Sequence, residues 1–125
     1  MEPQFVELEY VLSLHDASLR AFGGQAGIRD RGLLESAATQ PINEYLYAHA
    51  DLFGIAAAYA FHLAQAQAFV DGNKRTAIAT ALAFLKLNGV VPRNNADRLY
   101  DAMIGIAEHR LTKADLAQLF RELFA

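Results

Sequence analysis

Hydrophobic side chains recur every three or four residues near the start of the chain, which is the spacing of an amphipathic helix. They are Leu8, Val11, Leu12, Leu14, Leu19 and Phe22. Because Gly23-Gly24 follows as a stop signal, the pattern predicts a helix over about 7–22. Asp30 is suited to cap a second, short helix over about 31–39, and Pro41 is expected to end it.

Two segments in the middle of the chain are apolar nearly all round. They are residues 52–67, "LFGIAAAYAFHLAQAQ", and residues 76–87, "TAIATALAFLKL". Helices with no polar face lie in the middle of a bundle, so these two are expected to form a core hairpin. Asp51 is a candidate cap for the first helix, and Asn88-Gly89 is expected to end the second.

Two further helices are expected near the end of the chain, over about 95–109 and 113–124. Asn94 is a candidate cap for the first of them, after a turn at Pro92 and "RNN". Thr112 is a candidate cap for the second. Together with Asp115 it resembles a capping box in which Asp replaces the usual Glu.

The segment "PINEYLYAHAD", residues 41–51, has no helical period and is expected to form a long loop or flap. Strand patterns are nearly absent from the chain. We therefore expect an all-α fold, a bundle of five or six helices around the buried hairpin, and a single domain over residues 1–125.

The composition is that of an ordinary globular protein. Of the 125 residues, 54% are hydrophobic and 20% charged, the formal net charge is −3, and there is no Cys. The missing thiols exclude disulfides and thiolate zinc sites and suit a cytoplasmic location. The first ten residues do not resemble a signal peptide, and the apolar runs at 53–61 and 77–84 are too short to cross a membrane. The acidic net charge argues against direct nucleic-acid binding.

A polar loop, "FVDGNKR" at residues 69–75, separates the two apolar helices, where a plain turn needs only Gly72. The unpaired N–H groups at a helix start attract anions, and Lys74 and Arg75 add positive charge. Asp71 supplies an oxygen ligand of the kind that Mg²⁺ accepts when phosphate and water fill its remaining positions. This polar loop therefore indicates a di- or triphosphate site. The alternative is an ordinary turn in which Asn73 caps the helix and the two cations are solvated.

The stretch "AFVDGNKRTA", followed by an apolar helix that ends in "LNG", resembles the central motif of the Fic/Doc superfamily, specifically its Doc-like, death-on-curing toxin branch. Upstream, "GGQAGIRDRGLLESAATQP" also resembles that branch, so the likeness runs from about Val6 to Gly89. The resemblance implies a helical Fido fold, ATP or a related nucleotide as substrate, and transfer of a phosphoryl or nucleotidyl group to a protein hydroxyl.

The same resemblance assigns roles to the residues of the polar loop. Phe69 would anchor the loop, Asp71 would hold Mg²⁺, and Arg75 would clamp a phosphate. The anion nest would consist of Gly72, Asn73 and Lys74. The Doc-like branch has Lys at the position of Lys74, where the nucleotidyl-transferring branch usually has Gly. Ile78 stands where the nucleotidyl-transferring branch has a second Arg. The comparison favours phosphoryl transfer, with a translation factor as target class, over adenylylation.

Gln67 stands where the family places its catalytic His, and Ala68 stands where the family commonly has Pro. A His accepts the proton of an attacking hydroxyl near neutral pH, whereas a Gln cannot. The candidate catalytic positions are therefore Gln67, Lys74 and Arg75, and loss of the base is expected to slow turnover by about 10²–10⁴. Nucleotide binding should survive better than turnover.

No other His is an obvious substitute for that base. His62 is expected to point away from the site, and His15 and His109 cannot be placed from sequence. His49 is the least remote candidate, because the expected flap would lie near the nucleotide. Tyr45 and Tyr47 on the same flap are candidates for gripping a target peptide, although ordinary packing explains them equally well.

Three kinds of function follow from these features. The first is a Doc-like toxin of a toxin–antitoxin module, impaired at Gln67, with a nucleotidyltransferase as the alternative enzyme. The second is a module without catalysis that binds a nucleotide or a partner, and the third is an unrelated phosphatase or nuclease. The self-inhibitory motif Ser/Thr-x-x-x-Glu-Gly/Asn of some Fic proteins is absent. Inhibition is therefore expected from a small antitoxin whose amphipathic helix enters an apolar groove.

Overall fold

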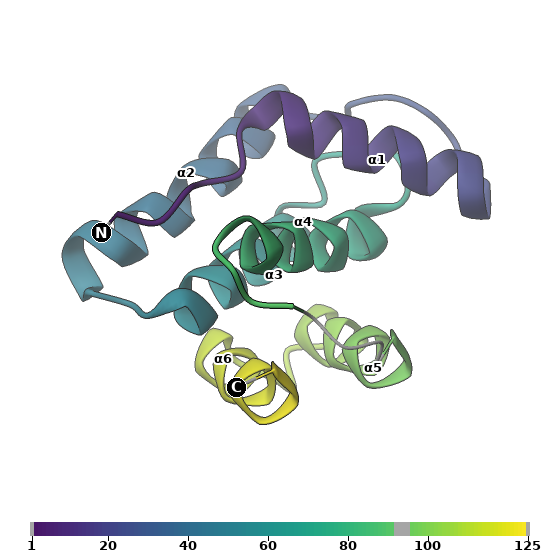
Figure 1. Cartoon of the computed structure of the whole chain (residues 1–125). Coiled ribbons are helices and arrows are strands. Elements are labelled where there is room, and N and C mark those ends of the chain that lie inside the picture. Colours follow the sequence, from purple (N-terminus) through teal and green to yellow (C-terminus); the bar gives the residue numbers. More distant parts are fainter. Residues whose placement is uncertain (1, 92–95, 125) are drawn as a thin grey trace.

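The computed structural model describes residues 2–91 and 96–124 of the chain. Its helices are α1 (Leu8–Phe22), α2 (Arg31–Ala48), α3 (Leu52–Ala66), α4 (Asn73–Leu87), α5 (Ala96–Ala107) and α6 (Lys113–Phe124). Over these residues the structure has no strand beyond an isolated antiparallel bridge between Ile28 and Phe69. The predicted all-α bundle is thereby confirmed (Figure 1). Within the same residues, no helix is long and apolar enough to cross a membrane.

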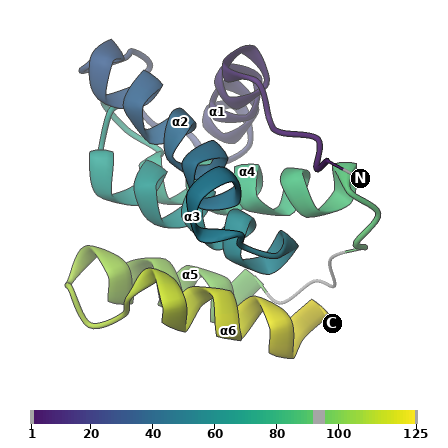
Figure 2. The same cartoon turned by 90° about the vertical axis from the view of Figure 1, so that its left-hand side faces the viewer.

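The helices form three layers with the α3–α4 hairpin in the middle. α1 and α2 lie on one side of it, and α5 and α6 lie on the other (Figures 1 and 2). The hairpin is covered on both sides, so it carries little polar surface. Its fully buried residues include Ile55, Ala56, Ala57, Ala58, Tyr59, Ala60, Ala77, Ala81, Phe84 and Leu85. This arrangement confirms the predicted core hairpin. The many alanines on α3 allow its neighbours to approach closely.

The helix caps expected from the sequence are present where the structure describes them. The Asp30 carboxylate accepts from Leu33 N–H at 3.0 Å, and that of Asp51 accepts from Gly54 N–H at 2.8 Å. Thr112 N–H donates to Asp115 Oδ2 at 2.9 Å, and Asp115 N–H donates to Thr112 Oγ1 at 3.1 Å, which confirms the capping box. The cap expected at Asn94 and the turn expected at 92–95 lie outside the described residues.

The prediction that Pro41 ends a helix, and that residues 41–51 form a flap, is wrong. α2 continues through Pro41 to Ala48, and His49 follows as a left-handed C-cap with φ 53°. An interior Pro costs about 3 kcal/mol because it removes a hydrogen bond and crowds the preceding turn. Here the ring of Pro41 is buried, and Tyr45 packs edge-on against Phe5 at 5.9 Å. We infer that this tertiary packing offsets the local penalty.

The start of the chain and α6 are fastened to the hairpin by polar contacts. Tyr59, buried in α3, accepts from Val6 N–H at 2.8 Å, and burial raises the pKa of its phenol to about 12. On α6, Lys113 pairs with Glu44 of α2, and its Nζ lies 3.4 Å from His62 Nε2. Burial lowers the pKa of His62, and the neighbouring Lys113 lowers it further against an opposing effect of Glu44.

Candidate functional site

The loop between α3 and α4 is shaped by two residues in the left-handed region. Gln67 ends α3 with φ 46° and ψ 45°, and Gly72 precedes α4 with φ 78° and ψ 17°. Asn73 closes the turn between them. Its Oδ1 accepts from Phe69 N–H and its Nδ2 donates to Phe69 C=O, both at 3.0 Å. The Asn73 side chain is therefore committed to the loop, so only its backbone N–H remains for an anion.

A second segment, residues 24–30, lies alongside this loop and holds it by backbone hydrogen bonds. Arg29 and Asp30 donate their N–H groups to Ala68 C=O at 2.7 and 3.0 Å, and Val70 N–H donates to Gly27 C=O at 3.0 Å. The Arg29 side chain also donates to Gln67 C=O at 2.6 Å. The position of Gln67 is thus fixed from a part of the chain that is distant in sequence.

His15 of α1 supports the loop from its buried side. The imidazole stacks on the Phe69 ring, with centroids 3.7 Å apart and planes within 9°, and its Nε2 donates to Asp71 C=O at 2.8 Å. The side chains of His15 and Phe69 are both buried. The buried Phe69 ring and the His15 imidazole therefore pack together beneath the loop, and His15 is a supporting residue that sequence reasoning did not place.

The start of α4 is the part of the site that is suited to an anion. Its first helical hydrogen bond runs from Thr76 N–H to Gly72 C=O, and no side chain caps this end. The N–H groups of Asn73, Lys74 and Arg75 precede that bond, so they are the unpaired donors that every helix start presents. Any other residue at position 72 would be strained at this φ.

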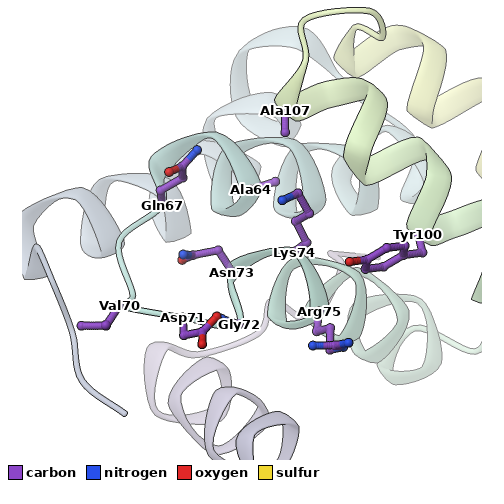
Figure 3. A pocket seen from close by; sticks show the side chains of 10 residues that line it. All are labelled: Ala64, Gln67, Val70, Asp71, Gly72, Asn73, Lys74, Arg75, Tyr100 and Ala107. Atoms are coloured by element: carbon purple, nitrogen blue, oxygen red, sulfur yellow. The ribbon is translucent and has the colours of Figure 1, made fainter. Parts of the chain in front are cut away.

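A pocket of about 200 Å³ opens at this helix start. Its lining residues are Ala64, Gln67, Val70, Asp71, Gly72, Asn73, Lys74, Arg75, Tyr100 and Ala107. Lys74 and Arg75 leave α4 on opposite sides (Figure 3). The Arg75 guanidinium lies 4.6 Å from the centroid of the Phe22 ring. A guanidinium over an aromatic ring still has several N–H donors, which suit phosphate oxygens.

Asp71 projects from the loop at the edge of the pocket. Its Oδ1 accepts from Gly72 N–H at 2.9 Å, and its Oδ2 accepts from Gln25 N–H at 3.2 Å. Each carboxylate oxygen keeps a free lone pair, because the two oxygens offer about four acceptor sites in all. No group of three or more metal-ligating His, Asp or Glu side chains occurs among the described residues. One exposed carboxylate suits Mg²⁺ that carries phosphate and water, and does not suit a cage of protein ligands.

The residues expected on a flap are not part of this pocket. Tyr45, Tyr47 and His49 lie around the N-terminal end of α3, whereas Gln67 lies just past its C-terminal end. A helix of 15 residues spans about 22 Å. The reasoning that placed His49 near the nucleotide is therefore wrong, because it depended on a loop that is helical in the structure. His62 faces Lys113, away from the pocket, as expected.

Comparisons with known proteins point to one family. A model of the Fic/DOC family matches residues 5–85. The protein kinase Doc of Escherichia phage P1 is 33% identical over 117 residues, which cover 93% of this chain and 92% of that protein. The toxin Doc of Mycolicibacterium smegmatis is 40% identical over 109 residues, which cover 83% of this chain and 81% of that protein. The matched region of the family model contains the whole loop and most of α4.

Proposed function

Because the chain belongs to the Fic/DOC family, we propose that it is a Doc-like toxin that uses a magnesium nucleotide to modify a protein. The reaction is phosphoryl transfer to a Ser or Thr hydroxyl, with a translation factor as the target class. The observation that carries the proposal is the uncapped start of α4, where Asp71, Lys74 and Arg75 surround one pocket.

Each group in the pocket has a role in this reaction. The N–H groups of the first turn of α4 bind phosphate oxygens, and Lys74 and Arg75 offset the negative charge that remains. Asp71 would hold Mg²⁺, which supplies charge neutralisation to the phosphates when it is bound. Within the described residues, neither Lys74 nor Arg75 forms an ion pair, so both cations are available to a ligand.

Gln67 is expected to limit the rate of phosphoryl transfer at this site. The side-chain oxygen accepts a hydrogen bond from an incoming hydroxyl, so it can orient the acceptor, but it does not take the proton. Turnover is therefore expected to lie about 10²–10⁴ below that of a site with a positioned base. The proposed phosphate contacts come from the start of α4, Lys74 and Arg75, so nucleotide binding is expected to persist.

The same residue favours a second candidate function, a module that keeps the fold and the nucleotide site without catalysis. In either case we propose that a small antitoxin protein binds the bundle through an amphipathic helix. Recovery of no small partner in a pull-down from the native host would count against the antitoxin. Nucleotidyl transfer by the same pocket is the alternative chemistry.

Labelled ATP separates these possibilities. The wild-type chain and Gln67→His are incubated in cell extract with ATP labelled at the γ-phosphate or at the α-phosphate. Transfer of the γ label to protein by Gln67→His supports phosphoryl transfer, whereas transfer of the α label supports nucleotidyl transfer. If Gln67→His and the double variant Gln67→His with Ala68→Pro both label no protein but still bind ATP, the binding module replaces the enzyme.

Calorimetry tests the anion site independently of catalysis. Lys74→Ala and Arg75→Ala are each expected to weaken Mg-ATP binding, because charge-assisted contacts to phosphate are lost. Arg31→Ala is a matched control, since Arg31 pairs with Glu35 on the surface of α2, outside the pocket. Unchanged affinity in the double variant of Lys74 and Arg75 would remove the anion-site assignment.

A further inference from the structure

The pocket has a second wall that comes from α5. Tyr100 and Ala107 lie on this helix, which follows the region that the family model matches. Tyr100 is the aromatic residue among those that line the pocket, and it lies at the end opposite Val70 and Asp71 (Figure 3). The helix start of α4 lies between the two ends, so a nucleotide bound there by its phosphates has Tyr100 on one side.

The Tyr100 ring is both firmly placed and uncovered. Leu99, Met103 and Ile106 on the same helix are buried in the core and fix the position of α5. Tyr100 itself remains 41% exposed, and its centroid lies 6.0 Å from the Arg75 guanidinium. Ala64 and Ala107 are the pocket's smallest side-chain-bearing residues, and they leave room beside the ring.

On this basis we propose that Tyr100 binds the base of the nucleotide by stacking. The inference rests on the proposed function, because it presupposes a nucleotide whose phosphates occupy the start of α4. The start of α4 and the Tyr100 ring line the same pocket, so a nucleotide held by its phosphates at the helix start can place its base against the ring. An exposed aromatic face is the surface that binds flat rings most strongly. Tyr100 would then contribute affinity for a nucleotide over a bare polyphosphate.

The test compares Mg-ATP with Mg-tripolyphosphate, which has phosphates and no base, by calorimetry. Tyr100→Ala is expected to weaken ATP binding about 5- to 100-fold and to change tripolyphosphate binding less than about twofold. Tyr100→Phe keeps the ring and should keep the affinity for ATP. Tyr10→Ala is the matched control, because Tyr10 is 43% exposed on α1 and does not line the pocket.

Three outcomes overturn the proposal. Equal weakening of both ligands by Tyr100→Ala would mean that the ring only supports the phosphate site, and no weakening of either would mean that the base lies elsewhere. A loss confined to ATP in Val70→Ala would move the base to the other end of the pocket. If Tyr100→Ala does not fold, Tyr100→Leu keeps the apolar volume without the aromatic face and answers the same question. Failure of the wild-type chain to bind either ligand would instead reject the proposed function, and this inference with it.

Discussion

Gly24 is predicted to control Asp71, the proposed magnesium ligand, through a direct contact with its side chain. A Cβ added at Gly24 would lie 2.9 Å from Asp71 Oδ2, closer than Cβ atoms approach their neighbours in proteins, and 3.0 Å from Leu19 Cδ2, which is a tight contact. Both atoms are the ends of flexible side chains, so they can move aside at little cost. Gly24→Ala is expected to displace Asp71 Oδ2, one of the two oxygens that we propose for Mg²⁺, and to break the bond that Gln25 N–H donates to that oxygen.

Gly23→Ala separates this contact from backbone strain. Gly24 has φ 121°, and Gly23 has φ 78° with ψ −176°, conformations that are essentially restricted to glycine. Each substitution should therefore lower the free energy of unfolding by about 1–3 kcal/mol. A Cβ at Gly23 meets nothing within 4 Å, so that variant carries strain without the clash. The two variants should be similarly destabilised, and only Gly24→Ala should disturb Asp71.

The assay measures urea unfolding and then ATP affinity with Mg²⁺ and with EDTA. Disturbing a residue that orients a metal ligand typically lowers metal affinity about 10- to 100-fold, so Gly24→Ala should lose most of the Mg²⁺-dependent gain in ATP affinity. Asp71→Asn provides the full loss for reference. The reasoning is refuted if Gly24→Ala keeps the wild-type Mg²⁺ dependence, or if Gly23→Ala loses it equally.

Four further predictions concern stability, and urea unfolding checks each of them. Asn73→Ala leaves Phe69 N–H and C=O without their partners and should cost about 2–4 kcal/mol; an unchanged midpoint would contradict the closing role of Asn73. Tyr59→Phe removes the acceptor of Val6 N–H and should cost about 1–3 kcal/mol. Thr76 Oγ1 is buried with no partner in the described structure, so Thr76→Val should be neutral or stabilising, and a marked loss would reveal a hidden partner. Because the pKa of His62 is lowered on folding, the unfolded chain binds more protons below about pH 6.5. Stability should therefore fall as the pH drops through this range, and His62→Gln should flatten that dependence.

The parts of the fold that followed from the sequence are those decided by near neighbours. Asp30, Asp51 and the Thr112–Asp115 pair each bond a backbone group three residues away, so residue type and spacing were sufficient. Pro41 is the counterexample. The local rule ends the helix there, but the surrounding contacts, such as that between Tyr45 and Phe5, come from residues that are distant in sequence.

In the candidate site, too, the sequence predicted residues that are close together in the chain but not contacts between residues that are far apart. Asp71, Gly72, Lys74 and Arg75 lie within five consecutive positions of the sequence, and they line one pocket. The supporting contacts could not be read from spacing. His15 lies 56 residues before Asp71, and Arg29 lies 38 residues before Gln67. Tyr100 carries no pattern that would distinguish it from any surface tyrosine, and it becomes visible only when α5 is packed beside α4.

The backbone conformation of Gln67 matters for the proposal that this residue replaces a catalytic His. Its left-handed φ and ψ are uncommon for residues other than glycine, but His is among the side chains enriched there. Gln67→His is therefore compatible with the existing backbone. Proline at position 68 is different, because its ring disfavours helical ψ values in the residue before it, and Gln67 has ψ 45°. Adding Ala68→Pro would force the backbone at Gln67 to change as well as the side chain. Activity regained by Gln67→His alone would thus locate the defect in the missing base, whereas activity that also requires Ala68→Pro would locate part of it in the shape of the loop.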